Sequence, residues 1–216
     1  MMERATPATG SNTAPRRIAA LHAALGIPPD YAGRRGLPLC PEARSLVEIG
    51  VDCFGRPQRL TPGAARAFAR LRTAAAADGI VIEVVSAFRD IDYQAALIRR
   101  KLDAGQPIAR ILEVSAAPGF SEHHTGRALD LTTPGLPPLD GAFAASPAYR
   151  WLRQNAEKFG FAESYPAANP YGLIWEPWHW AWRSGRAILP PPLRPPASGG
   201  GGDEMIPREQ GSNASS

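Results

Sequence analysis

Apolar residues recur at helical spacing near the start of the chain. Ile18, Leu21 and Leu25 fall on one face of a helix, and a glycine follows them. This pattern predicts a helix over residues 16–25, because apolar side chains three and four residues apart line one helical face. His22 lies beside that apolar face, and we expect it to be a packing or surface residue and not a metal ligand.

The same spacing predicts further helices, each with a recognisable start. Thr61 and Ser146 are each followed by proline, and a hydroxyl N-cap before a proline in the first turn is a strong helix start. Asp90 can cap another helix, which carries the apolar residues Tyr93, Leu97, Ile98 and Leu102. Residues 107–114 predict one more short helical piece.

Strands are predicted where β-branched or aromatic residues cluster. Residues 80–85 are almost wholly β-branched and predict a buried strand. Residues 127–131 also predict a strand, and the aromatic residues 172–182 predict a strand region. An extended piece is expected at residues 46–51, within the loop-rich segment 27–60. Helices and strands follow one another in the mixed order that is typical of an α+β fold.

The two ends of the chain lack the apolar residues that a core needs. Residues 1–15 are small and polar, and residues 190–216 are rich in proline, glycine and serine. Both segments are expected to be disordered. The folded unit is predicted to be a single domain over residues 16–189, since a chain of 216 residues is long enough for one domain with a sizeable core.

Composition and charge exclude several classes of protein. The chain is 44% hydrophobic and 20% charged, which is ordinary for a globular protein. Its formal net charge is +4, but the arginines are scattered and no basic stripe carries interleaved aromatic residues, so no nucleic-acid partner is expected. Cys40 and Cys53 form no Cys-x-x-Cys pair. We expect two free thiols, and a zinc ribbon is excluded.

No segment predicts a membrane span or a secretory signal. A span needs about 18 uninterrupted apolar residues, and no window approaches that length. The first residues carry charge without an apolar run behind them. A monomeric, cytoplasmic protein is therefore the default expectation, with a periplasmic location if an export signal precedes this N-terminus.

Side chains that can do chemistry concentrate in residues 118–130. This stretch holds two of the four histidines, His123 and His124, together with Asp130. Gly126 lies between them, so the chain can turn there and bring His123 or His124 close to Asp130. Neighbouring residues of an extended chain point to opposite sides, so only one of the two histidines can bind a metal. The residues alone leave open which one does.

His179 completes a candidate metal site. A catalytic zinc takes three protein ligands from His, Asp or Glu, and His123, Asp130 and His179 are such a set. Glu176 is separated from His179 by a proline and a tryptophan, which predicts an extended or bulged segment and places a general base near the ion. A second interpretation stays open, in which residues 121–124 form a polar turn and His179 is an edge histidine.

Three elements follow one another over about residues 80–182. In chain order they are Ser86-Ala-Phe-Arg89-x-x-x-Tyr93-Gln94, Ser121-x-His123-x-x-Gly126-x-Ala128-x-Asp130, and Glu176-Pro-Trp-His179. Together they resemble the LAS zinc peptidases, and within them the VanY-type D-alanyl-D-alanine carboxypeptidases. His124 stands where that family often has glutamine, and Ala87-Phe88 replaces a Gly-Tyr pair.

The resemblance implies a fold and a role for each matched residue. The fold is α+β, with a small, largely antiparallel sheet that is flanked by helices, as in the Hedgehog and DD-peptidase proteins. One Zn²⁺ per chain would be held by His123, Asp130 and His179. Glu176 would be the catalytic base, and Arg89 would hold or polarise the scissile carbonyl. The substrate-binding residues that it implies are Ser86, Gln94 and Ser121.

The implied activity is removal of the terminal D-Ala from peptidoglycan stem peptides or their precursors by metal-activated water. A D,D-dipeptidase and an L-alanyl-D-glutamate endopeptidase use the same scaffold and are the nearest alternatives. The endopeptidases tend to have aspartate where this chain has Glu176, which argues against them. A non-catalytic, zinc-stabilised binding domain is an alternative from another class, and it would have no need of a base.

Overall fold

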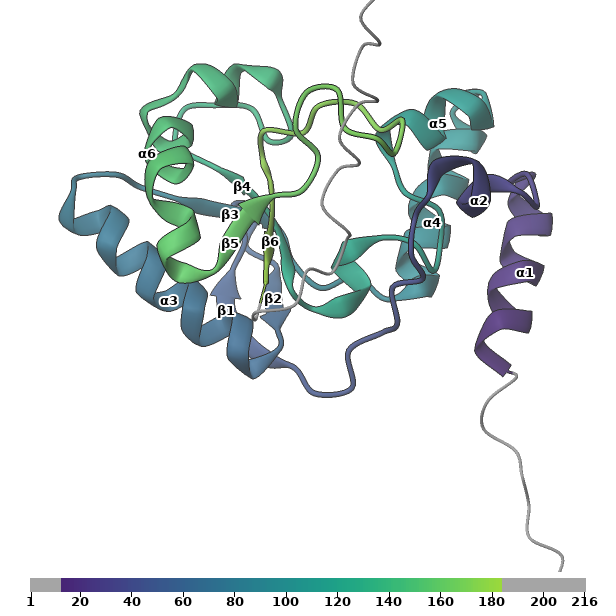
Figure 1. The fold of residues 1–216 in the computed structure, drawn as a ribbon, viewed down its shortest axis with the longest axis horizontal. Helices are drawn as coiled ribbons and strands as arrows, with labels where there is room; N and C mark the ends of the chain where they lie inside the picture. Colours follow the sequence, from purple (N-terminus) through teal and green to yellow (C-terminus); the bar gives the residue numbers. More distant parts are fainter. Residues whose placement is uncertain (1–12, 184–216) are drawn as a thin grey trace, which may run out of the picture.

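A four-stranded antiparallel sheet lies at the centre of the computed structural model, which describes residues 13–183 (Figure 1). The strands lie in the order β3-β4-β6-β5, and their bounds are Glu83–Ser86 for β3, Ala128–Thr132 for β4, His179–Trp182 for β6 and Phe161–Glu163 for β5. Every residue of β4 is buried. A central strand that is covered on both faces needs no polar alternation.

Helices flank this sheet on two sides. Figure 1 shows α3 and α6 on one side, and α1, α2, α4 and α5 on the other. Their bounds are Thr13–Leu25 (α1), Tyr31–Arg35 (α2), Pro62–Ala77 (α3), Ile91–Asp103 (α4), Ile108–Val114 (α5) and Pro147–Asn155 (α6). A separate antiparallel pair is formed by β1 (Val47–Val51) and β2 (Pro57–Leu60). Three 3₁₀ helices are η1 (Glu122–Thr125), η2 (Gly141–Ala145) and η3 (Ala156–Phe159).

Two hydrophobic clusters fill the space between these elements. One contains Leu129 and Leu131 of β4 and Trp180 of β6, packed with residues of α3 and α6. The other joins α1, α2, α4 and α5, with Ile98 of α4 fully buried in it. Because successive side chains of a strand point to opposite faces, Asp130 lies on the face of β4 away from Leu129 and Leu131. That face looks toward the second cluster.

The α+β class expected from the sequence is confirmed, and so are most helix starts. Asp90 accepts a hydrogen bond from the backbone N–H of Tyr93, and Ser146 caps α6 in the same way. Thr61 precedes α3 as expected, but its side chain makes no capping hydrogen bond. Of the apolar residues expected on α4, Ile98 is fully buried, whereas Tyr93 is 43% exposed and its neighbour Gln94 is buried.

The strand predicted over residues 127–131 is β4, with the expected five residues, but two other strands are shorter than predicted. The strand expected at residues 80–85 is β3, four residues long, and of the aromatic region only β6 is a strand. The sequence prediction missed β2, β5 and α2, which have three to five residues each. Elements this short contain too few residues for a periodic pattern to show.

The N-terminal boundary differs from the expected one. α1 begins at Thr13, inside the segment 1–15 that was expected to be disordered. The rest of that prediction, and the prediction for residues 190–216, lie outside the described residues, and the single-domain boundary stays a prediction.

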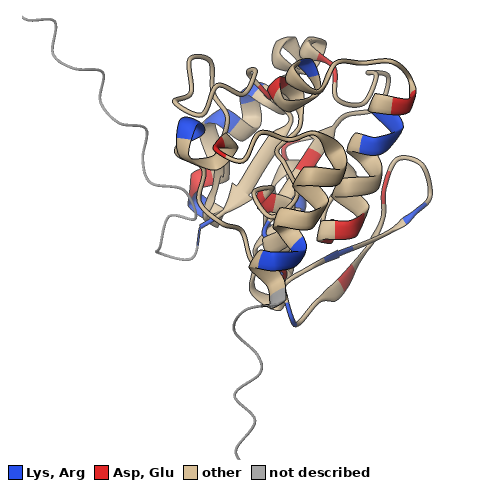
Figure 2. Cartoon of the chain, turned by 90° about the vertical axis from the view of Figure 1, so that its right-hand side faces the viewer, with Lys and Arg blue, Asp and Glu red and all other residues tan. Residues whose placement is uncertain are grey.

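Both cysteines are free thiols, as expected, with Cys40 buried and Cys53 exposed. Among residues 13–183, no helix is both long and apolar enough to cross a membrane. Figure 2 shows cationic and acidic residues interspersed on the elements that face the viewer.

Candidate metal centre and its cleft

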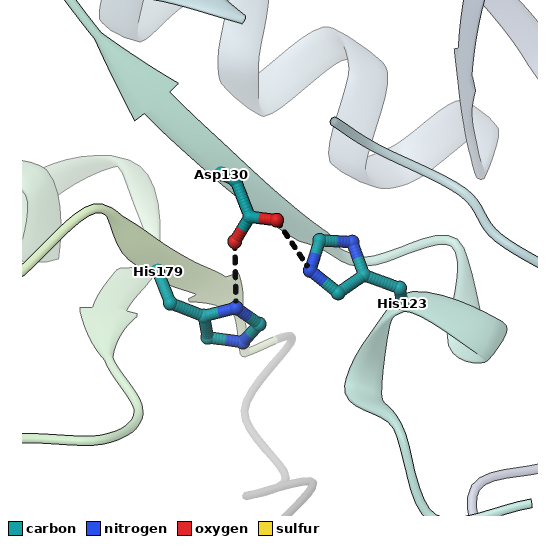
Figure 3. A group of neighbouring side chains, drawn as sticks. All are labelled: His123, Asp130 and His179. Atoms are coloured by element: carbon teal, nitrogen blue, oxygen red, sulfur yellow. Dashed lines mark hydrogen bonds and ion pairs between the residues drawn. The ribbon is translucent and has the colours of Figure 1, made fainter. Parts of the chain in front are cut away.

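Two neighbouring strands and one 3₁₀ helix bring the proposed ligands together. Asp130 of β4 and His179 of β6 are direct partners in the strand pairing, so their side chains leave the sheet side by side. His123 reaches them from η1, which ends at Gly126 with φ of 60°. One ligand atom from each of the three residues lies within 4.8 Å of the other two. Figure 3 shows Asp130 between the two rings.

The hydrogen bonds of His123 leave a lone pair pointing at Asp130. Its Nδ1 lies 2.5 Å from the carbonyl oxygen of Ala87, and because a carbonyl can only accept, Nδ1 carries the proton. Nε2 is therefore an unprotonated nitrogen. It lies 3.2 Å from Oδ2 of Asp130 but is buried without a hydrogen-bond partner. Burial lowers the pKa of His123 to about 4, so the ring is neutral.

Two electron-rich atoms that face each other in a buried site repel unless a cation lies between them. The donor set, two imidazoles and a carboxylate, is the set that zinc takes in catalytic sites. The orphaned Nε2 of His123 and the carboxylate of Asp130 therefore fit a bound zinc ion.

His179 is held between two buried carboxylates. Its Nδ1 lies 3.0 Å from Oδ1 of Asp130, and its Nε2 lies 2.9 Å from Oε2 of Glu122. Burial alone would lower the pKa of His179, but the hydrogen bonds to Asp130 and Glu122 raise it to about 10. A metal ion at Nδ1 would take the place of one proton, while the bond from Nε2 to Glu122 would persist.

Glu122 is a functional candidate that the sequence reasoning missed. Its side chain is fully buried, and although burial raises its pKa, the hydrogen bond from His179 lowers it below the usual value. A metal-ligating histidine commonly donates its other N–H to a carboxylate, which fixes the ring orientation. Only its position next to His123 could have pointed to it, because its partner is 57 residues away in the chain.

His124 is turned away from the cluster. Its Nδ1 lies 2.6 Å from the carbonyl oxygen of Arg89, and its Nε2 accepts from the backbone N–H of Gly119. The expectation of an extended backbone here is wrong, because both histidines lie in η1. The structure nevertheless brings only His123 to Asp130.

Glu176 lies beside the metal cluster, at the first position of the turn that leads to His179. Its Oε2 is 3.9 Å from Nδ1 of His179, and its side chain is 12% exposed. The backbone N–H of His179 donates to the carbonyl of Glu176, so Pro177 lies in a tight turn and not in the extended or bulged segment that was expected. Burial raises the pKa of Glu176 to about 7, which suits a group that must accept and return a proton near neutral pH.

Arg89 reaches the same cluster from the segment after β3. Its Nη1 lies 3.4 Å from Oδ2 of Asp130, and its side chain is 17% exposed. Its backbone N–H donates to the carbonyl of His123. Together with the carbonyl of Ala87, which holds the His123 ring, this bond ties residues 87–89 to η1.

A cleft of about 330 Å³ opens over these residues. His123, Asp130, His179, Glu176 and Arg89 all line it, so the sequence-predicted metal and catalytic candidates share one solvent-accessible space. The site lies where the sheet meets the helical cluster that contains α4. An open metal site on a cleft can admit both water and a substrate.

The three predicted substrate-binding residues differ in position. Gln94 and Ser121 line the cleft, whereas Ser86 is not among the described residues that do so. The side-chain N–H of Gln94 donates to the carbonyl of Ala116, and its Oε1 is buried without a partner. Ser86 is paired with Asp130 across β3 and β4, which places it beside the site.

A buried His–Asp–His cluster with a nearby carboxylate and an open cleft is typical of a hydrolytic metal centre. The model of the VanY D-alanyl-D-alanine carboxypeptidases matches residues 57–185, which is more than half of the chain. The chain belongs to this family.

Individual relatives agree with that assignment. A D-alanyl-D-alanine carboxypeptidase of Enterococcus faecalis is 32% identical over 117 residues, which cover 50% of this chain and 42% of the relative. The match thus spans less than half the length of that relative.

Two solved structures share the fold. The LdcB LD-carboxypeptidase matches with a TM-score of 0.58 and 29% identity, over 65% of this chain and 69% of its own. A vancomycin-resistance D,D-pentapeptidase, VanY, in complex with Zn(II) matches with a TM-score of 0.53 and 27% identity, over 67% of this chain and 82% of its own. Both likenesses confirm the fold class.

Proposed function

We propose that this chain is a monomeric, zinc-dependent D,D-carboxypeptidase that removes the terminal D-Ala from peptidoglycan stem peptides. The observation that carries the proposal is the unprotonated Nε2 of His123, which faces the Asp130 carboxylate on the wall of an open cleft. Membership of the VanY family supports the choice of substrate.

His123, Asp130 and His179 would hold one zinc ion per chain. When bound, the ion would supply a Lewis acid and lower the pKa of water at the site toward about 7. Glu122 would keep the His179 ring in place through Nε2. This leaves Nδ1 of His179, Nε2 of His123 and one carboxylate oxygen as the three ligand atoms.

Two further side chains would transfer the proton and stabilise the developing negative charge. Glu176 would take a proton from the attacking water and return it to the leaving amine nitrogen, which its raised pKa allows. The Arg89 guanidinium would stabilise the negative charge that develops on the scissile carbonyl oxygen. Gln94 and Ser121 line the same cleft, and both would contribute polar groups to the substrate pocket.

The test pairs zinc quantification with D-alanine release from a pentapeptide that ends in D-Ala-D-Ala. We expect about one zinc per chain and turnover in the native protein. Glu176→Gln should keep the zinc and lose turnover by a factor of about a hundred or more, because the base is gone. Glu157→Gln, at an exposed acidic residue of η3, is the matched control and should behave like the native protein.

Other substrates separate the alternatives. Free D-Ala-D-Ala reports dipeptidase activity, and a tripeptide with an L-Ala-D-Glu bond reports endopeptidase activity. A tetrapeptide with one terminal D-Ala is included because a structural neighbour is named an LD-carboxypeptidase. Faster turnover of any of these than of the pentapeptide would replace the proposed activity. Bound zinc without turnover of any peptide would favour the non-catalytic binding domain.

A further inference from the structure

One cation of the cleft has no part in the mechanism above. Lys101 lies in the last turn of α4 and lines the same cleft as the metal cluster. It follows Gln94 by seven residues, which is close to two helical turns, so both side chains project from one face of α4. The chain has only one other lysine, Lys158, which is exposed on η3.

The ammonium of Lys101 has a neutral partner and no ion pair. Its Nζ donates to Oγ of Ser115 at 2.8 Å, and within residues 13–183 no carboxylate oxygen lies within the 4.0 Å of an ion pair. The side chain is half-buried. Burial lowers its pKa, the charge of Arg89 lowers it further, and Glu176 opposes these effects.

A half-buried ammonium without a counter-ion has lost part of its hydration, and a ligand of opposite charge would offset that cost. The carboxylate of Glu176 acts on Lys101 through its field, but among the ion pairs of residues 13–183 there is none between the two. Ser115, which contacts Lys101, and its chain neighbours Val114 and Ala116 also line the cleft and carry no charge. The cleft therefore has an unmatched positive site on its α4 side.

We propose that Lys101 is the residue that recognises a carboxylate of the substrate, with Ser115 holding the ammonium in position. This inference rests on the proposed peptidase function and adds a specificity residue to it. A stem peptide offers two such groups: the free C-terminal carboxylate of the residue that is released, and the carboxylate of an acidic residue upstream of the scissile bond. Both would accept a hydrogen bond from Nζ.

The experiment measures binding, so that it does not depend on turnover. Zinc-loaded protein that carries Glu176→Gln is titrated calorimetrically with a pentapeptide ending in D-Ala-D-Ala. Two analogues are titrated alongside, one with a C-terminal amide and one with its upstream acidic residue converted to the amide. Each titration is repeated after adding Lys101→Met, which keeps the aliphatic stem without the charge, or Lys101→Arg, which keeps the charge. Lys158→Met is the matched control.

Lys101→Met should weaken binding of the parent pentapeptide about tenfold or more, the effect of losing a hydrogen bond to a charged group. Lys101→Arg should recover most of that loss, and Lys158→Met should cause none. The carboxylate that Lys101 contacts is identified by the analogue whose affinity Lys101→Met does not change. If this is the C-terminal amide, Lys101 contacts the carboxylate of the released residue. If it is the other analogue, Lys101 contacts the upstream acidic residue.

The inference is overturned if Lys101→Met weakens all three peptides equally, which a purely structural role predicts, or if it weakens none. The turnover of the native protein is measured separately. A native protein that binds the pentapeptide through Lys101 without cleaving it would contradict the proposed function and leave this inference standing. Turnover by the native protein, with no effect of Lys101→Met on peptide binding, would support the proposed function and contradict this inference.

Discussion

At the scale of single residues, the site depends on a short chain of buried contacts. Asp130 contacts both histidine rings, and Glu122 contacts His179 from the far side. Each ring thus has one nitrogen fixed by a protein acceptor, and the other nitrogen is directed at Asp130. The acceptor for His123 is the carbonyl of Ala87, and the acceptor for His179 is the carboxylate of Glu122. Because these acceptors choose the tautomers, they decide which nitrogens can bind a metal.

Glu122→Gln should weaken zinc binding without unfolding the protein. The amide keeps the shape of the side chain but removes the charge that makes His179 a strong ligand, and losses of about 10- to 100-fold in metal affinity are usual for such partners. Competition for zinc with a coloured chelator measures this affinity, and circular dichroism checks the fold. Glu157→Gln serves as the control. Equal zinc affinity in the native protein and in Glu122→Gln would show that Glu122 does not support the ligand.

At the scale of elements, the turn from η1 into β4 sets the position of His123 relative to Asp130. Gly126 makes this turn with φ of 60°, in the left-handed region that side chains disfavour. A Cβ there would lie 2.8 Å from Cδ2 of Leu46 and 3.1 Å from Cβ of Ala43. The turn therefore needs glycine both for its backbone conformation and for close packing against the segment before β1.

Two variants, Gly126→Ala and Gly36→Ala, separate the effect of backbone conformation from the effect of close packing. Gly36 ends α2 with φ of 61°, and a Cβ there would meet nothing within 4 Å. Gly36→Ala should lower the free energy of unfolding by about 1–2 kcal/mol, the cost of left-handed backbone alone. Gly126→Ala should lower it by about a further 1–3 kcal/mol, because the packed neighbours must move. Denaturant unfolding followed by tryptophan fluorescence measures both, and equal losses would mean that packing at Gly126 has no effect.

At the scale of the whole molecule, the candidate centre joins parts of the chain that are far apart in sequence. It connects η1, β4 and β6 at the junction between the sheet cluster and the helical cluster. An ion that binds only this folded arrangement adds stability by mass action, about 2.7 kcal/mol when its concentration is a hundred times its dissociation constant.

Zinc should therefore raise the melting temperature, and the increase should grow with pH between about 6 and 8. The increase grows with pH because of His179, whose pKa is raised to about 10 in the metal-free site by its hydrogen bonds to Asp130 and Glu122. Its Nδ1 must release a proton for zinc to bind, and that release becomes easier as the pH rises. Thermal unfolding with zinc and with a chelator, at several pH values, measures the increase. Asp130→Asn should show almost no increase in melting temperature with zinc. An increase in the native protein that does not depend on pH would contradict the release of a proton from His179.

Sequence patterns identified those features that depend on local chemistry. Asp90 and Ser146 were expected to start helices, and both cap them, because a capping bond spans only three residues. The residues proposed as ligands were also found in the sequence, since His, Asp and glycine at short spacing are informative by type. Helical spacing alone could not show which face of α4 meets the core: Tyr93 is exposed and Gln94 is buried.

The tertiary structure decided everything that depends on distances between remote segments. Extended-chain reasoning could not choose between His123 and His124, because the backbone there is a 3₁₀ helix whose neighbours hold one ring toward Asp130 and the other toward Gly119. Glu122 and Lys101 carry no sequence signal of their own. Their proposed roles arise from partners dozens of residues away, or from the absence of a charged partner in the described structure. The sequence by itself thus determined the chemical types at the site, and the fold determined their directions, tautomers and charges.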